Sequence, residues 1–90
     1  MARNSIGLIE LSSIASGFAV TDAMLKASDV ELVVARSICS GKYMVLVRGD
    51  VAAVESAVDA GTRTGAFSIV DSFVIPNVHD DIFPALSGTS

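Results

Sequence analysis

The sequence predicts an α+β domain in which two helices cover one face of a four-stranded antiparallel sheet. Four short runs of aliphatic and β-branched residues are typical of strands, and two longer segments carry apolar residues at helical spacing. Their order along the chain is β-α-β-β-α-β, which is the ferredoxin-like arrangement. Ninety residues allow one domain. We place this domain at residues 5–86 and expect a flexible C-terminal tail over residues 87–90.

Residues 5–11 form the first predicted strand, an aliphatic run with one charged residue. A helix over residues 14–28 follows, with Ser12 and Ser13 as candidate N-caps. Two stripes of apolar residues run along this helix, so we expect it to pack on two sides. The stripes consist of Ile14, Phe18 and Leu25 on one side and of Ala15, Ala19, Ala23 and Ala27 on the other.

Residues 30–38 and 43–47 form the second and third predicted strands. The polar break between them contains the only cysteine, Cys39, and a turn glycine, Gly41. Two strands joined by so short a connection should pair as an antiparallel hairpin. The thiol is therefore expected at an exposed hairpin tip, where a structural cysteine would not normally lie.

A second helix is predicted over residues 51–64, with Asp50 as its N-cap and Gly65 as its C-cap. Residues 68–76 form the fourth predicted strand. One face of the second helix carries apolar or small residues at spacings of three, four and three, which indicates burial. This predicted buried face consists of Val51, Val54, Val58 and Gly61.

Composition excludes several classes of protein. Hydrophobic residues make up 51% of the chain and the mean hydropathy is +0.61, which is more apolar material than a small monomer needs, so we expect an oligomer. No apolar run reaches the roughly 18 residues that span a membrane. The net charge of −4, without a cluster of Lys or Arg, argues against nucleic acid. A single cysteine excludes an internal disulfide, and we expect a cytoplasmic protein.

The sequence resembles the hexamer-forming, BMC-domain shell proteins of bacterial microcompartments from about residue 5 to about residue 84. The order and spacing of four short stretches carry this resemblance, together with the matching order of helices and strands. The stretches are residues 6–10 (Ile-Gly-Leu-Ile-Glu), 22–26 (Asp-Ala-Met-Leu-Lys), 40–42 (Ser-Gly-Lys) and 47–51 (Val-Arg-Gly-Asp-Val).

The resemblance implies a cyclic homohexamer with a narrow central pore, tiling into a flat layer with other shell proteins. It implies that Lys26 lies at the hexamer edge, and that Arg48 and His79 serve contacts inside the hexamer. The family's usual Arg-Pro-His is replaced at residues 77–79 by Asn-Val-His, so only the histidine is kept. The pore rim that it implies consists of Ile38, Cys39, Ser40 and Gly41.

Two subgroups of the family are closer in detail. The opening strand, residues 75–79 and the ending Ala-Leu-Ser-Gly are similar to the first half of the double-domain, iron–sulfur-carrying shell subunits of propanediol-utilisation compartments. A single-domain chain with a cysteine at this place resembles the shell proteins that accompany glycyl-radical diol enzymes.

A ring with the hairpin tip on its axis would bring several copies of Cys39 to one site, which is what an iron–sulfur cluster requires. A cuboidal cluster has threefold but no sixfold axes, so at most three alternate cysteines could bind equivalently. We therefore expect Cys39 to hold an iron–sulfur cluster of the 4Fe–4S type, shared between subunits at the pore, where it transfers electrons or plugs the opening. A zinc ion, or no metal with Cys39 as a partly exposed hydrophobe, is the alternative.

Two other functions compete with a shell subunit. A ferredoxin-like small-molecule-binding regulatory module, such as a trimeric signalling domain, would need phosphate-cradling glycines or a convergent polar pocket, and the sequence shows neither. A thiol enzyme using Cys39 and His79 lacks any supporting constellation, so we expect no catalytic residues.

Overall fold

A computed structural model of the protein describes residues 5–39 and 41–78. The predicted extension of the domain to residue 86, the tail over residues 87–90, Ser40 and His79 lie outside the described residues. Six main elements follow one another in the predicted order, with one short 3₁₀ turn before the last strand. Together with the 3₁₀ turn η1 (Ala66–Ser68), they are β1 (Ser5–Leu11), α1 (Ile14–Ala27), β2 (Glu31–Ser37), β3 (Tyr43–Gly49), α2 (Val51–Gly65) and β4 (Ile69–Ile75).

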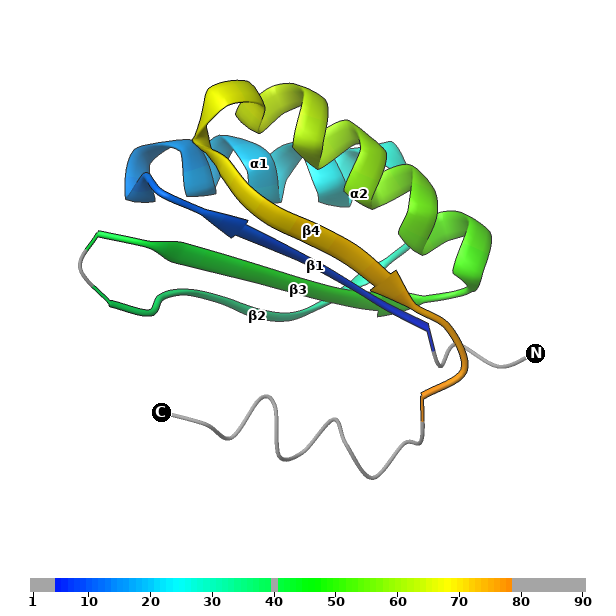
Figure 1. The fold of residues 1–90 in the computed structure, drawn as a ribbon. Coiled ribbons are helices and arrows are strands. Elements are labelled where there is room, and N and C mark those ends of the chain that lie inside the picture. The colour runs from blue at the N-terminus through cyan, green and yellow to red at the C-terminus, as the bar shows by residue number, and fades with distance from the viewer. Residues whose placement is uncertain (1–4, 40, 79–90) are drawn as a thin grey trace.

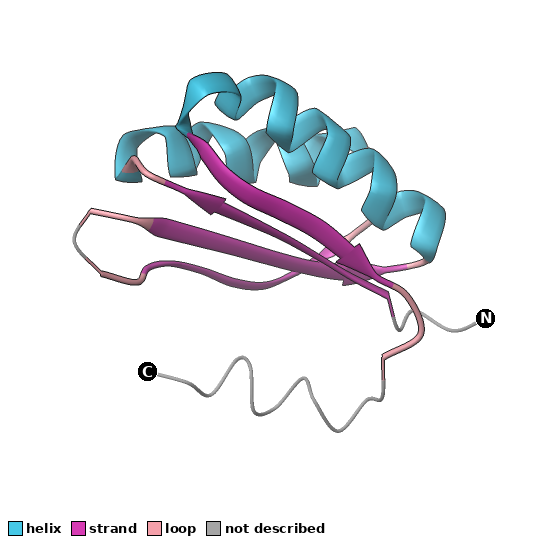
Figure 2. Ribbon diagram, in the orientation of Figure 1, coloured by secondary structure: helices cyan, strands magenta, loops and turns pink. Residues whose placement is uncertain are grey.

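The strands form one antiparallel sheet in the order β2-β3-β1-β4, and both helices lie on one face of it (Figure 1). Figure 2 shows the two layers directly, with the helices above the strands. The central strands β1 and β3 pair with each other, which leaves β2 and β4 as the two edges of the sheet. The predicted α+β, ferredoxin-like fold class is confirmed.

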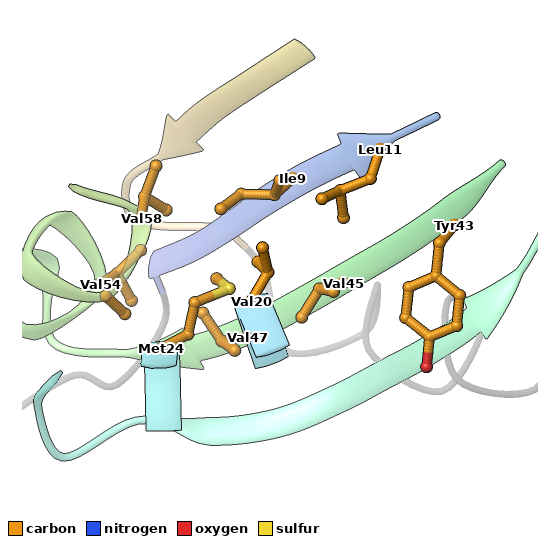
Figure 3. Packing of buried hydrophobic residues seen from close by; sticks show 10 residues of the cluster. Ile9, Leu11, Val20, Met24, Tyr43, Val45, Val47, Val54 and Val58 are labelled. Carbon is orange, nitrogen blue, oxygen red and sulfur yellow. The ribbon is translucent and has the colours of Figure 1, made fainter. Parts of the chain in front are cut away.

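The core lies between the helices and the central strands (Figure 3). Alternate residues of β1 and β3 point at the helices, as the period of two in a strand requires. A smaller cluster around Ile6 and Leu46 packs on the opposite face of the sheet, together with the side chain of Val78. The main core cluster consists of Ile9, Leu11, Val20, Met24, Tyr43, Val45, Val47, Val54, Ala57 and Val58.

Helix α1 buries a different face from the one that the sequence predicted. Its buried residues are Gly17, Val20 and Met24. Ile14, Phe18 and Leu25 are 41%, 66% and 39% exposed. Gly17 explains why this face is buried, because the helix approaches the sheet so closely there that a side chain would overlap the ring of Tyr43. The large apolar residues are consequently turned outward, so this predicted stripe is not packed within the protomer.

The ends of α2 also differ from expectation. Asp50 occupies the N-cap position, but its side chain makes no capping hydrogen bond; its carbonyl accepts the N–H of Val54 at 2.9 Å. Val51 is 44% exposed, so the buried face begins one turn later than predicted. Gly65 is the last, buried residue of the helix, and Ala66 is the C-cap, with a φ of 47°. Gly65 packs closely against Ile69, whose side-chain end would have to shift to admit a Cβ.

Within the described part of the chain, neither helix approaches the length that crossing a bilayer requires: α1 has 14 residues and α2 has 15.

Candidate functional site

The candidate site is the turn between β2 and β3, at the left end of the sheet in Figure 1. Two backbone hydrogen bonds close it: Ile38 N–H donates to the Lys42 carbonyl at 3.0 Å, and Lys42 N–H donates to the Cys39 carbonyl at 2.7 Å. Gly41, the residue before Lys42, has a φ of 83°, in the left-handed region that favours glycine. The predicted hairpin is therefore present, with its glycine in the conformation that glycine adopts most easily.

The turn exposes the cysteine. Cys39 is a free, exposed thiol, and Ile38 beside it is 41% exposed. Gly41 is exposed as well, with no heavy atom within 4 Å of where its Cβ would lie. Three of the four residues predicted for a pore rim thus lie together at the tip. The fourth, Ser40, is outside the described residues.

A single copy of the chain brings one thiol to this site. Among residues 5–39 and 41–78, no group of three or more His, Cys, Asp or Glu side chains could hold a metal ion. The thiolate of Cys39 is a suitable ligand for iron in a cluster, and its exposure would let it reach a group shared with other copies. The residues present therefore fit a shared metal centre and do not fit one held by a single protomer.

Aromatic packing anchors the base of the turn. Tyr43, the first residue of β3, is 6% exposed and lies under Gly17 of α1. The ring of Phe18 meets it edge to face, with the ring centroids 5.8 Å apart and an interplanar angle of 64°. The turn therefore starts from a fixed point in the core, although its tip is open to solvent.

The charged residue nearest the tip is held toward the sheet. Lys42 Nζ lies 3.7 Å from Glu10 Oε2, and the two side chains are 44% and 27% exposed. Sequence reasoning did not find Glu10 as a partner of Lys42. The contact follows from the pairing of β1 with β3, because Glu10 and Lys42 lie at the same end of these two strands.

The predicted contact residues lie elsewhere. Lys26 is in the last turn of α1, 77% exposed, and forms an i,i+4 ion pair with Asp22 at 3.0 Å. Arg48 lies at the end of β3 away from the turn, where its Nε is 3.2 Å from Glu31 Oε1. Sequence reasoning also missed Glu31, because a register shift between residues 32 and 34 of β2 brings it opposite Arg48. Arg48 and the turn therefore lie at opposite ends of β3.

Comparison with known proteins adds a family and several relatives. The profile described as BMC domain matches residues 5–78. The bacterial microcompartment shell protein PduA of Citrobacter freundii is 36% identical, with 91% of this chain and 90% of the relative aligned. The shell protein EutM of Escherichia coli K12 is 39% identical, with 96% of this chain and 95% of the relative aligned.

Two other similar proteins are about twice as long as this chain. The shell protein PduT of Citrobacter freundii is 46% identical over 93% of this chain and 46% of its own length. A crystal structure described as a microcompartments protein from Desulfitobacterium hafniense DCB superposes with a TM-score of 0.93 at 50% identity, over 99% of this chain and 49% of that one. The chain thus spans about half the length of these two proteins.

Proposed function

The chain belongs to the BMC domain family of bacterial microcompartment shell proteins, and we propose that it forms a cyclic homohexamer whose central pore is lined by the β2–β3 turns. It is a structural protein rather than an enzyme, and its place is the microcompartment shell in the bacterial cytoplasm. BMC domains form hexamers with other shell proteins. Family membership favours this role over the small-molecule-binding module that the sequence left open.

Exposed apolar side chains support assembly of the protomer. Large hydrophobic residues remain exposed on α1 and on both edge strands, including Phe18, Leu32 and Phe73. Phe67, in the 3₁₀ turn, is fully exposed. So much open apolar surface is unusual for a small soluble monomer, and contacts between subunits would cover it. In the proposed hexamer, Arg48 and His79 serve contacts between subunits, and Lys26 lies at the outer edge, where hexamers meet in a layer.

The pore rim in this proposal consists of Ile38, Cys39, Ser40 and Gly41. We further propose that Cys39 binds an iron–sulfur cluster, of the 4Fe–4S type, shared by alternate subunits. The observation that carries this is the position of a free, exposed thiol at the hairpin tip, the one place where rotation about a pore axis brings copies together. When bound, the cluster would supply one-electron transfer across the shell or would plug the opening.

The chain's resemblance to cysteine-bearing shell proteins also supports a place in a compartment. We propose that it belongs with glycyl-radical enzymes that process a diol such as propanediol. PduT of Citrobacter freundii, 46% identical over 93% of this chain, is likewise a bacterial microcompartment shell protein.

Native mass spectrometry of anaerobically purified protein tests both parts of the proposal. We expect a six-subunit ring that carries iron and acid-labile sulfide, in a brown preparation. The matched control is Cys39→Ser, which should keep the ring and lose the iron and the colour, because the exposed thiol takes no part in the core. A colourless, iron-free wild type would reject the cluster alone. A discrete trimer or a monomer would reject the shell hexamer.

A further inference from the structure

A row of four residues crosses the face of the sheet opposite the helices. Arg36 of β2 pairs with Met44 of β3, Met44 pairs with Glu10 of β1, and Glu10 pairs with Asp71 of β4. Because residues paired across antiparallel strands point to the same face, all four side chains share this face. The row therefore places a positive charge on one edge of the sheet and a negative charge on the other edge.

The two edges have unlike charges at the same level of the sheet. Arg36 and Asp71 are both exposed, and each lies on a strand with a neighbour on one side only. The β2–β3 turn lies at one end of the sheet, and β2 and β4 are its two edges (Figure 1). In the proposed hexamer this turn points at the axis, so the strands run outward from it and each subunit is a wedge with β2 and β4 as its flanks. A closed ring joins unlike flanks, so that β2 of one copy faces β4 of the next.

Rotation about the ring axis keeps every residue at its own radius. Residues that meet across such a ring interface must therefore lie at about the same distance from the axis. Because the strands run outward from the axis, the residues of one cross-strand row lie at about the same distance from it. We infer that Arg36 of each subunit forms an ion pair with Asp71 of the neighbouring subunit, and that this pair sets which edges meet. The inference rests on the proposed hexamer and names the surface by which a second copy is recognised.

The charges around Asp71 favour an external partner. Asp71 faces Glu10 directly, and like charges in this position repel each other. Glu10 has Lys42 at 3.7 Å, whereas Asp71 has no ion pair among the residues that the structure describes. Its Oδ1 accepts the N–H of Ser72 at 2.9 Å. A guanidinium from a second copy would neutralise the carboxylate. The Arg36 guanidinium carries several N–H donors, of which Nε–H donates to the Ser37 carbonyl at 3.4 Å within the protomer.

The next cross-strand row on the same face of the sheet ends in an apolar residue at each edge, so these two edge residues could also pack against each other across the ring interface. Val34 of β2 pairs with Leu46, Leu46 with Leu8, and Leu8 with Phe73 of β4. Its two edge residues are both apolar, and Phe73 is 41% exposed. Joining β2 to β4 would bury Val34 against Phe73 beside the ion pair. In the outermost row Glu31 faces Ile75 across the interface, and its charge is already paired with Arg48.

Charge reversal tests the pair by native mass spectrometry and sedimentation at low and high salt. We expect Arg36→Asp and Asp71→Arg each to weaken ring assembly by about tenfold or more, because each places like charges at every interface. The double variant R36D/D71R should restore the ring. The matched control is Arg63→Asp, which reverses an exposed charge paired within α2 and should leave assembly unchanged. Circular dichroism checks that every variant is folded.

The outcomes separate this inference from the function on which it rests. If the wild type is hexameric and both single reversals assemble like Arg63→Asp, the ion pair is wrong and the hexamer stands. If the double variant assembles no better than the singles, the pair is also wrong. If the wild type forms no hexamer, the proposed ring is wrong, and the ion pair across its interfaces is wrong as well.

Discussion

The backbone N–H of Lys42 donates to the carbonyl oxygen of Cys39 at 2.7 Å, so the residue that follows the turn fixes the position of the cysteine that begins it. The chain can make this bond because Gly41 lies between them with a φ of 83°. The exposure of the thiol is thus a property of the turn geometry.

Replacing Gly41 with alanine should strain this turn. No heavy atom lies within 4 Å of the position of a Cβ at Gly41, so the cost comes from the positive φ alone. We expect Gly41→Ala to lower the free energy of unfolding by about 1 kcal/mol, measured by urea denaturation. Gly41→Asn is the control, because asparagine tolerates positive φ better and should cost less. An alanine variant as stable as the wild type would show that the turn does not need the glycine.

Replacing Gly17 tests the close approach of α1 to the sheet. Alanine favours a helix by about 1 kcal/mol over glycine, but here its methyl group would overlap the ring of Tyr43. We expect Gly17→Ala to destabilise the protein by about 1–3 kcal/mol, measured by chemical denaturation. The exposed substitution Ala19→Gly on the same helix measures the propensity term by itself. If Gly17→Ala stabilises the protein by the amount that Ala19→Gly costs, the predicted overlap is absent.

Strand positions could be predicted from the sequence with little error, because buried strands show themselves as short aliphatic runs between turn residues. The expected first strand, residues 5–11, matches β1 at both ends. The hairpin could be predicted equally well, since Gly41 and the polar residues around Cys39 indicate a turn. The face on which α1 packs could not be predicted, because the residue that lies closest to the sheet on that face is a glycine, Gly17. Hydrophobic periodicity gives weight to large side chains, and it therefore selected Phe18 over Gly17.

The charged partners of Arg48 and Lys42 depend on strand register and strand order, which the sequence does not show. A regular hairpin would place Leu32 opposite Arg48, and the register shift between residues 32 and 34 places Glu31 there instead. The pairing of Glu10 with Lys42 likewise requires knowledge that β1 lies beside β3. Contacts between strands that are distant in sequence were therefore found only in the structure.

Adjacent residues near the end of α1 give a direct test of the corrected packing face. Met24 is fully buried in the core, whereas Leu25 is 39% exposed. We expect Met24→Ala to lower the free energy of unfolding by about 2–5 kcal/mol, and Leu25→Ala to lower it by about 1 kcal/mol or less. Denaturation is compared at a concentration where both variants have the same oligomeric state. Equal losses would show that Leu25 contributes to packing as much as Met24 does.

Substitution of Lys26 separates folding from layer formation. Its ion pair with Asp22 is 3.0 Å long, but the side chains are 77% and 62% exposed, and exposed pairs contribute little. We expect Lys26→Ala to change the free energy of unfolding by no more than about 0.5 kcal/mol. If Lys26 lies at the hexamer edge, as we propose, the variant should still form hexamers and should fail to form layers under the electron microscope.

The chain supplies a matched control for that experiment. Arg63 forms the same kind of i,i+4 pair with Asp59 on α2, at 2.8 Å, and its side chain is 74% exposed. Arg63→Ala removes an equivalent exposed charge and an equivalent ion pair, so its effect on stability should match that of Lys26→Ala. Only the lysine variant should lose the layer, because only Lys26 is proposed to contact a neighbouring hexamer. Layers that form equally well from both variants would remove Lys26 from the hexamer edge while leaving the hexamer itself untouched.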